Sequence, residues 1–191
     1  MMGNQFDQID PRLLIQKARA GDREAFGYLY QRYYAPVFRY VYFRIRRKED
    51  AEDLTETVFL RTYQSIEKFN YIGQEFLAYL FIVARNLVID FWRRKKELPL
   101  DDQILSKEDY PEDELERDEK SRIIHQAIQG LNTMQQEVVI LKFIEELPNN
   151  EIAKMLGRSE EAIRQIQCRA LKALRERLKE IDSVESFDTK V

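Results

Sequence analysis

The sequence predicts an all-α protein with two small helical domains joined by an acidic linker. Apolar residues recur at spacings of three and four along most of the chain, and no stretch alternates convincingly with the period of two that marks a strand. Gly and Pro number only six and five among 191 residues, which suits a mostly helical protein. A chain of this length forms one domain or two small ones, since domains typically have roughly 100–150 residues.

The uneven distribution of charge divides the chain. The net charge is −3, but residues 1–96 carry 17 Lys and Arg against 12 Asp and Glu, whereas residues 97–120 carry 3 against 11. Residues 121–180 carry 10 against 8, and residues 181–191 carry 1 against 3. The strongly acidic segment has few large apolar groups and cannot form a core. We therefore predict domains at 1–96 and 121–180, a flexible linker at 97–120 and a tail at 181–191.

Composition also narrows the function classes. Cys168 is the only cysteine, which excludes an intrachain disulfide and a cysteine-based metal site. The first residues lack a secretory pattern, and no apolar run approaches the roughly 20 residues of a membrane span. The single histidine, His125, has no obvious nucleophile or set of metal ligands around it in the sequence, which disfavours a hydrolytic enzyme. We expect a cytoplasmic protein that is not an enzyme, uses no metal or cofactor and does not insert into a membrane.

The first domain is predicted to contain several apolar helical stripes. They begin near Phe26, Leu54 and Phe76 and continue at helical spacing. Pro36 suits the first turn of a helix better than its interior, so we expect a helix to begin there. The acidic stretch at residues 48–53 suits a helix N-terminus, because its charges complement the helix dipole.

The segment ARNLVIDFWRRKK, residues 84–96, places cations next to aromatic rings. Exposed rings and cations form the usual surface for single-stranded nucleic acid, where each stacked base contributes ~1–3 kcal/mol. The alternative is a helix C-terminus whose cations are favoured by the dipole, with the rings in the core. We assign Phe91 to the core and Trp92, at the edge of the apolar face, to nucleic acid with Arg93 and Arg94.

The second domain has the spacing of a helix-turn-helix. Helices are predicted at Ile123–Leu131, Met134–Ile144, Glu151–Leu156 and Glu160–Leu178. Ala153 lets two helices approach, Gly157 supplies a turn with positive φ, and Ser159 caps the following helix. The alternative is a small helical bundle with a polar outer face.

The polar face of the last predicted helix suits duplex DNA. Its members are Glu161, Arg164, Gln165, Cys168, Lys172 and Arg175. Arg and Gln make bidentate hydrogen bonds to base edges, and the cations hold phosphate. Glu160 and Glu161 complement the helix dipole but repel phosphate, so this domain alone should bind DNA weakly.

These blocks resemble a known family. DAEDLTETVFLRTYQSI (Asp50–Ile66) and FLAYLFIVARNLVIDFWRRKK (Phe76–Lys96) resemble region 2 of sigma-70-family RNA polymerase sigma factors. LNTMQQEVVILKFIEELPNNEIAKMLGRSEEAIRQIQCRALKAL (Leu131–Leu174) resembles region 4. With only a short acidic linker between them, the layout resembles the extracytoplasmic-function (ECF) group. The resemblance implies a transcription initiation factor that binds core RNA polymerase and directs it to promoters.

The resemblance also implies three binding surfaces. Region 2 of the family docks on the clamp helices of the polymerase β′ subunit, and the β flap is a further expected contact. The matching core-polymerase residues are Asp50, Glu52, Asp53, Leu54 and Phe59. The residues assigned to capture of the unwound −10 element are Asn70, Tyr71, Gln74, Arg85, Asn86, Asp90, Trp92, Arg93 and Arg94. Those assigned to the −35 duplex are Arg158, Ser159, Arg164, Gln165, Arg169 and Lys172.

Several positions depart from the family pattern. A glutamine usual in the polymerase-binding stretch is Glu56 here, and the tryptophan common before the Ala-Arg-Asn triplet is Tyr79. The serine that usually caps the first helix of the motif is Pro148, so Asn149 or Asn150 is expected to take over the cap. A basic residue often found near the middle of the recognition helix is Ile166, so the family's −35 preferences do not transfer.

Three further hypotheses follow. Such factors are commonly held inactive by an anti-sigma factor, which we expect as a partner. The linker of such factors runs through polymerase channels later used by nucleic acid, and the acidic charge here suits that role; the alternative is a solubilising spacer. Cys168 lies on the predicted DNA-facing side, and a redox switch at this thiol is the third hypothesis. The rival function is a stand-alone helix-turn-helix regulator that binds duplex DNA as a dimer.

Overall fold

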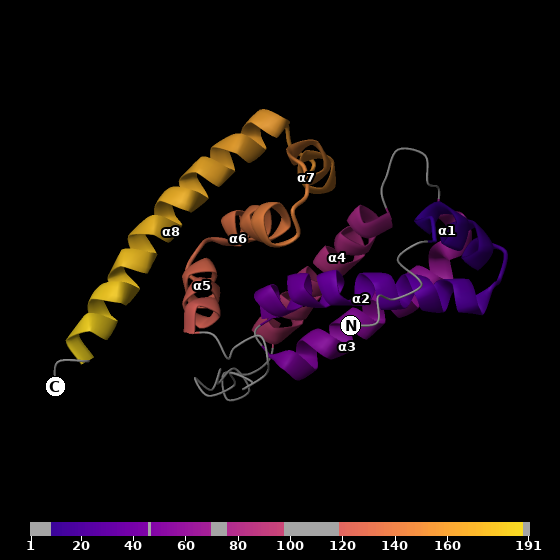
Figure 1. Ribbon diagram of the computed structural model, residues 1–191, viewed down its shortest axis with the longest axis horizontal. Helices are drawn as coiled ribbons and strands as arrows, with labels where there is room; N and C mark the ends of the chain where they lie inside the picture. The colour runs from indigo at the N-terminus through magenta and orange to yellow at the C-terminus, as the bar shows by residue number, and fades with distance from the viewer. Residues whose placement is uncertain (1–8, 46, 70–75, 98–118, 189–191) are drawn as a thin grey trace. The chain divides into compact units, whose positions relative to one another are not determined.

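The computed structural model describes residues 9–45, 47–69, 76–97 and 119–188. The chain divides into two compact units, residues 1–107 and 108–191, and the division lies within the predicted linker. Most of that linker, residues 98–118, lies outside the described residues. Every regular element in the described part of the chain is helical (Figure 1). The predicted all-α class with two helical domains is therefore confirmed.

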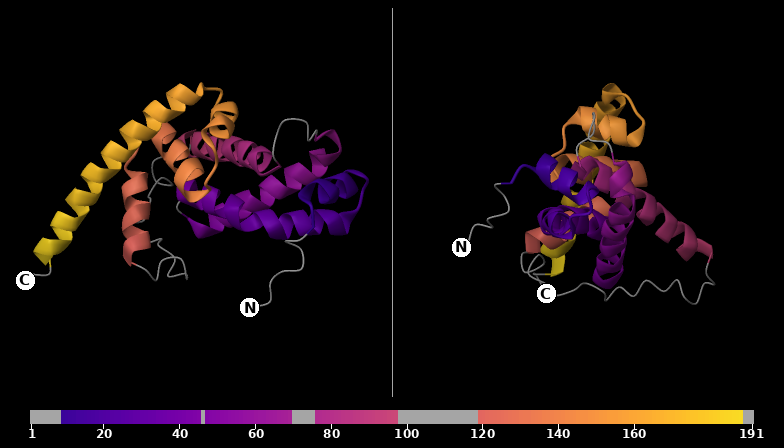
Figure 2. Two further views of the ribbon diagram at one scale, coloured as in Figure 1. Left: turned by 45° about the horizontal axis from the view of Figure 1, so that its top comes forward. Right: turned by 90° about the vertical axis from the view of Figure 1, so that its right-hand side faces the viewer.

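The described residues of unit 1 form four α-helices. They are α1 (Pro11–Arg19), α2 (Arg23–Ile45), α3 (Lys48–Ser65) and α4 (Phe76–Glu97), with a short 3₁₀ turn, η2 (Ile66–Lys68), after α3. The helices α2, α3 and α4 pack on one another, and α1 packs against α2 and η2 (Figures 1 and 2). This three-helix core positions two surfaces described below, one on each side of α3.

The core of unit 1 is built from apolar side chains at helical spacing. Its fully buried members include Leu29, Val37, Tyr40 and Val41 from α2, Val58 from α3, and Leu80, Phe81, Ala84 and Val88 from α4. Burying a large apolar side chain contributes roughly 1.5–3 kcal/mol, so these residues supply much of the stability of the unit. The stripes predicted around residues 26, 54 and 76 are thus real helix faces.

The expected start of a helix at Pro36 is wrong. The helix α2 runs without interruption from Arg23 to Ile45 and holds Pro36 in its interior. Proline has no N–H to donate to the carbonyl four residues earlier, which costs about 3 kcal/mol in a helix interior. Val37, Tyr40 and Val41 follow with no exposed surface, so core packing on both sides of the proline outweighs that loss.

The helix α1 was not among the predicted elements. Pro11 occupies its first turn, and the carboxylate of Asp10 accepts a hydrogen bond from the backbone N–H of Arg12 at 2.9 Å. Both are standard features of a helix start. Leu14, Ile15 and Ala18 are buried and anchor this short helix to the unit.

Unit 2 contains the predicted helix-turn-helix. Its elements are α5 (Glu119–Gln129), α6 (Thr133–Val139), a π-helical turn η4 (Ile140–Ile144), α7 (Asn149–Leu156) and α8 (Glu160–Asp188). Within this unit, α5, α6 and α7 all pack against α8 (Figure 2). The predicted helix Met134–Ile144 is therefore an α-helix that widens into a π turn, and α8 continues well past Leu178 into the residues expected to form a tail.

The turn of the motif agrees with the sequence prediction. Gly157 ends α7 with φ of 61°, the left-handed region that L-residues rarely enter. The hydroxyl of Ser159 accepts a hydrogen bond from the backbone N–H of Ala162 at 3.1 Å and so caps α8. Ile163 and Ala170 of α8 are fully buried, which fixes the opposite face toward the outside.

The expected cap of α7 by an asparagine is wrong. Asn149 and Asn150 lie inside the first turn, and no side chain caps this end among the described residues. The side chain of Asn149 instead pairs with that of Gln167 on α8: its Oδ1 accepts from Gln167 Nε2 at 2.9 Å. This asparagine therefore joins the two helices of the motif.

Candidate nucleic-acid and protein interfaces

The described residues that are predicted to capture the −10 element lie on α4, from Arg85 to Arg94. Asn86, Arg93 and Arg94 are exposed, while Arg85 and Asp90 are half-buried. Arg93 Nη2 lies 3.1 Å from Asp90 Oδ1, one helical turn away. Asn70, Tyr71 and Gln74, which were assigned to the same site, lie outside the described residues. The described part of the predicted site thus forms one continuous polar surface with two exposed cations.

Trp92 is held in a fixed orientation beside these cations. It is half-buried, as predicted from its place at the edge of the apolar face. Its indole Nε1 donates a hydrogen bond to the backbone carbonyl of Arg44 at 3.3 Å. The Lys95 ammonium lies 5.7 Å from the Trp92 ring centroid and 5.7 Å from that of Phe91. A rigid ring with a cation beside it is the arrangement that stacks on nucleobases.

Most other rings near this site belong to the core. Phe69 and Phe76 are buried, and Phe76 was assigned to the core from the sequence. Phe91, also assigned to the core, is half-buried. Tyr79 is half-buried, and its hydroxyl lies 2.9 Å from the Ser65 hydroxyl. Trp92 and Phe91 are therefore the described rings of α4 that lie half-buried beside a cation, and of these two Trp92 has a hydrogen bond that fixes its position.

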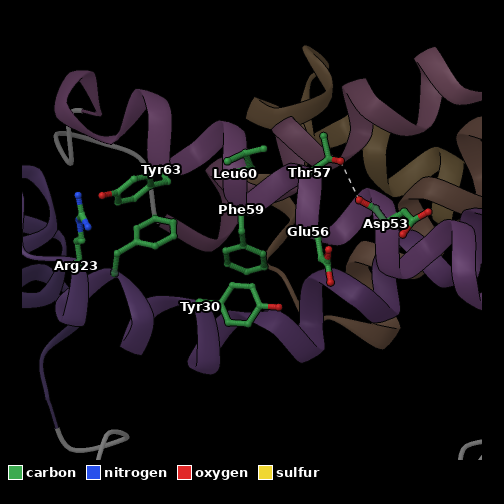
Figure 3. Close-up of a pocket in the computed structure, with 9 residues that line it drawn as sticks. Arg23, Tyr30, Asp53, Glu56, Thr57, Phe59, Leu60 and Tyr63 are labelled. Atoms are coloured by element: carbon green, nitrogen blue, oxygen red, sulfur yellow. Dashed lines mark hydrogen bonds between the residues drawn. The ribbon is translucent and has the colours of Figure 1, made fainter.

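A groove lies between α2 and α3. Its volume is about 870 Å³, and we call it the α2/α3 groove. It is lined by Arg23, Phe26 and Tyr30 from α2 and by Asp53, Glu56, Thr57, Phe59, Leu60 and Tyr63 from α3. Figure 3 shows the Tyr30 and Phe59 rings packed against each other in the groove, with ring centroids 4.7 Å apart. Leu60 is 57% exposed and Tyr63 39% exposed, so large apolar surface is open to solvent.

The α2/α3 groove is acidic along α3. Asp53 and Glu56 are exposed on its rim. Burial, followed by the charge of Glu56, raises the pKa of Tyr30 above its usual range. Burial, then the neighbouring Tyr30 and the charges of Glu52 and Glu56, raises the pKa of Tyr34. An apolar wall with an acidic rim suits a partner that presents apolar and basic side chains.

The structure separates the predicted polymerase residues. Asp53 lines the α2/α3 groove, and Glu52 is one of the charges that raise the pKa of Tyr34 on α2. Asp50 and Leu54 line the opposite side of α3, facing α4. Phe59 lines the groove but is only 2% exposed and packs on Tyr30, and its assignment to polymerase binding stays a prediction.

Sequence reasoning missed the exposed apolar residues of the groove. Leu60 and Tyr63 lie on α3 with Glu56, at spacings of four and three, so they share a helix face. Phe26 and Tyr30 contribute from α2, where the sequence predicts only an apolar helical stripe. The sequence does show an acidic residue followed on the same helix face by Leu and Tyr, a pattern that is compatible with a binding surface. Periodicity alone does not show which apolar residues of a helix stay exposed after the helices pack.

The residues predicted to bind the −35 duplex lie in the turn and on the outer face of α8. Arg158 and Ser159 are exposed in the turn, and Arg164, Gln165, Arg169 and Lys172 are exposed along the helix. Arg164 Nη2 lies 3.1 Å from Glu161 Oε2, and its Nη1 lies 3.9 Å from Glu160 Oε2. These carboxylates compete with DNA phosphate for the arginine, in line with the weak binding expected of this unit. Cys168 is also exposed.

Other kinds of site are not evident in the described part of the chain. Its His, Cys, Asp and Glu residues form no group of three or more that would hold a metal ion. None of its helices combines the length and the apolar character that crossing a membrane requires.

Comparisons with known proteins agree with the two-part architecture. Residues 29–97 match the family Sigma-70 region 2, and residues 127–176 match Sigma-70, region 4. The ECF RNA polymerase sigma factor BldN of Streptomyces coelicolor is 37% identical over 166 residues, which cover 84% of this chain and 63% of BldN. The ECF RNA polymerase sigma factor SigW of Bacillus subtilis is 29% identical over 180 residues, covering 87% of this chain and 96% of SigW.

The fold has a counterpart among solved structures. The structure of CnrH in complex with the cytosolic domain of CnrY aligns with a TM-score of 0.70 at 22% identity, covering 90% of this chain and 99% of CnrH. Two matched regions in the same order favour an initiation factor over a stand-alone dimeric regulator. The chain belongs to the sigma-70 family of RNA polymerase sigma factors, in the ECF group, and is a transcription initiation factor that directs the polymerase to promoters.

Proposed function

We propose that three surfaces of this chain divide the work of promoter recognition. The α2/α3 groove docks core RNA polymerase, the C-terminal half of α4 captures the unwound −10 element, and the outer face of α8 reads the −35 duplex. The observation that carries the proposal is the fixed, half-buried ring of Trp92 beside the exposed cations Arg93 and Arg94.

The capture of melted DNA follows from the chemistry of α4. A duplex hides its bases, and opening it costs roughly 1.4 kcal/mol for each stacked step. Extruded bases regain stabilisation when they stack on rings or hydrogen-bond to polar side chains while cations hold the backbone. Asn86 and Asp90 supply polar groups, Trp92 supplies a ring, and Arg93 and Arg94 supply positive charge. Their positions on one helix allow all three interactions to form together.

Recognition of duplex DNA falls to unit 2. The exposed Arg164, Gln165 and Arg169 suit base edges in the major groove, and Lys172 suits phosphate. Because Glu160 and Glu161 already engage Arg164, this surface is weak by itself. Joining two weak DNA surfaces on one polymerase raises the effective concentration of the second after the first has bound.

Polymerase docking is assigned to the α2/α3 groove. Leu60 and Tyr63 provide exposed apolar contacts, and Asp53 and Glu56 provide charge complementarity. Such apolar residues with a charged rim are typical of a protein interface. The clamp helices of the β′ subunit are the proposed occupant, and the β flap is the proposed contact of unit 2.

Two further aspects complete the proposal. The protein performs no chemistry of its own, because the polymerase forms the bonds of the transcript, and it works in the cytoplasm with that enzyme. We also propose an anti-sigma factor as a regulatory partner. The structure of CnrH with the cytosolic domain of CnrY supports this only by showing that a chain of the same fold holds another protein.

A gel shift with promoter DNA tests the proposal. The free protein should show little specific binding at physiological salt, whereas the protein with core polymerase should form a promoter-specific complex. The double variant Asp53→Ala, Leu60→Ala should lose the complex by losing polymerase, while Glu24→Ala, on the exposed start of α2, serves as the control. Specific binding by the free protein, unchanged by polymerase, would contradict the proposal and favour a stand-alone regulator.

A further inference from the structure

A second cavity lies on the other side of α3, where this helix faces α4. We call it the α3/α4 cleft, and its volume is about 390 Å³. It is lined by Arg47, Asp50, Leu54, Thr57, Arg61, Leu87, Asp90, Phe91, Arg94 and Lys95. The size lies within the roughly 300–1,000 Å³ range of small-molecule pockets, although the cleft is open on one side.

The charges of the α3/α4 cleft do not balance. Four cations line it against two carboxylates, for a net charge of +2. Both carboxylates already have cationic partners, since Asp50 lies 3.6 Å from Arg47 and Asp90 lies 3.1 Å from Arg93. Among the described residues, no carboxylate is paired with Arg61, Arg94 or Lys95. These three cations surround an apolar floor and repel one another unless an anion joins them.

The α3/α4 cleft continues the proposed −10 surface. Asp90 and Arg94 belong to both, and Arg93, on the outer side of α4, reaches back to Asp90. Lys95 lies in the cleft while its ammonium approaches the Trp92 ring. A nucleic-acid backbone that passes along the exposed side of α4 therefore meets the cleft at Arg94. Only Arg94 of the three unpaired cations was assigned to DNA from the sequence.

The contrast between the two sides of α3 strengthens this reading. The side facing α2 presents Asp53 and Glu56, which repel phosphate. The side facing α4 presents Arg61, which attracts phosphate, and one carboxylate, Asp50, which is paired with Arg47. Thr57 lines both cavities and marks the boundary between them. A single helix thus separates a surface suited to a protein from one suited to a polyanion.

We propose that the α3/α4 cleft binds a backbone phosphate of promoter DNA, held by Arg61 of α3 together with Arg94 and Lys95 of α4. This rests on the proposed capture of DNA by α4 and adds a contact from a second helix. Arg61 holds the strand in place and reads no base, because phosphate carries no sequence information. A free nucleotide has the same phosphate chemistry, and the experiment must distinguish these two sources.

The test measures promoter binding by the reconstituted holoenzyme across a series of salt concentrations. Arg61→Gln should weaken binding several-fold for any promoter sequence and lower the slope of log K against log salt by about 0.7–0.9, the range for one phosphate contact on single-stranded or duplex DNA. Arg61→Lys retains the charge and should retain most of the slope. Arg19→Gln, which removes an exposed cation at the end of α1, should leave affinity and slope unchanged.

Two controls separate this role from a structural one. Hydrogen exchange of α3 should be the same in Arg61→Gln and the wild type, and both should compete equally for core polymerase. A wild-type slope in Arg61→Gln would overturn the inference while leaving the proposed function intact. Failure of the wild-type holoenzyme to bind any promoter would instead overturn the proposed function, and the inference with it.

A third measurement addresses the free nucleotide. Equilibrium dialysis of the free protein against ATP should show no saturable binding that depends on Arg61. Saturable ATP binding that Arg61→Gln abolishes, together with an unchanged salt slope of the holoenzyme, would assign the cleft to a nucleotide and overturn its assignment to DNA.

Discussion

The indole N–H of Trp92 donates a hydrogen bond to the backbone carbonyl of Arg44, 3.3 Å away. This contact ties the end of α4 to the end of α2 and fixes the ring beside Arg93 and Lys95. The hydrogen bond therefore links the packing of unit 1 to the orientation of a DNA-binding side chain.

Replacing Trp92 with Phe should separate anchoring from stacking. Phe keeps a ring but loses the donor, so α4 should lose about 1 kcal/mol of local stability. Hydrogen exchange of the α4 amides checks this, because it reports on unit 1 separately from unit 2. Promoter opening should fall less in Trp92→Phe than in Trp92→Ala, which also loses the ring. Unchanged α4 protection in Trp92→Phe would show that the indole hydrogen bond contributes nothing.

Two glycines should respond in opposite directions to alanine. Gly157→Ala places a Cβ at φ of 61° and should destabilise unit 2 by roughly 1–2 kcal/mol. Gly27→Ala lies within α2, where a Cβ meets nothing within 4 Å, and should stabilise unit 1 by about 0.5–1 kcal/mol. Urea unfolding checks both: Trp92, the only tryptophan, reports on unit 1, and circular dichroism reports on the whole chain. Because Gly157 lies in unit 2, Gly157→Ala should leave the unfolding transition that Trp92 reports for unit 1 unchanged. A shift of that transition would show that the two units do not unfold independently.

The pair formed by Asn149 and Gln167 should couple α7 to α8. A double-mutant cycle with Asn149→Ala and Gln167→Ala should give a coupling free energy of about 0.5–1.5 kcal/mol for unit 2. Gln165→Ala, on the exposed face of α8, is the matched control and should change stability by less than about 0.5 kcal/mol. Additive single-variant effects would mean that the pair does not join the motif.

Alkaline pH should destabilise unit 1 through Tyr30, which lines the α2/α3 groove, and its neighbour Tyr34 on α2. Burial and nearby carboxylates raise the pKa of Tyr30 and Tyr34, so these phenols stay protonated in the folded chain after they ionise in the unfolded chain. The free energy of unfolding should be unaffected by these groups below pH about 10, the ordinary tyrosine pKa, and should fall as the pH rises above it. Tyr30→Phe and Tyr34→Phe should each flatten that fall. Identical pH profiles in wild type and variants would contradict the raised pKa values.

Removing a carboxylate beside Arg164 should strengthen promoter binding. Glu161→Gln releases the arginine from a contact at 3.1 Å and lowers the repulsion of phosphate. A gain of about 1 kcal/mol corresponds to roughly fivefold tighter binding by the holoenzyme at low salt. Glu24→Gln makes the same charge change in unit 1 and should have no such effect. Weaker binding in Glu161→Gln would show that Glu161 orients Arg164 for the bases.

Local patterns accounted for much of the fold. Helical periodicity located the cores of α2, α3 and α4, and Gly157 and Ser159 defined the turn because positive φ and capping leave residue-specific signatures. Pro36 misled because a local penalty was outweighed by burial that only the assembled core shows. Asn149 misled because its partner lies 18 residues away, on α8.

The candidate sites were only partly predictable. The cations of α4 and α8 were recognisable because clustered Arg and Lys are seldom buried. Leu60 and Tyr63 were not, because an apolar residue on a helix is equally consistent with a core or an uncovered groove. Arg61 was missed for a different reason: its neighbours Arg94 and Lys95 come from another helix, and only the packing of α3 on α4 brings them together.

The most direct test of the central claim is run-off transcription from one promoter supplied both as duplex and with the −10 element already unpaired. Core polymerase with the wild-type protein should initiate on both templates. With the double variant Arg93→Ala, Arg94→Ala, the transcript yield on the duplex should fall roughly tenfold or more, which corresponds to about 1.4 kcal/mol. On the opened template much of that yield should be recovered, because the cost of melting has been removed. Equal activity of variant and wild type on the duplex, or an equal loss on both templates, would contradict the capture of melted DNA by α4.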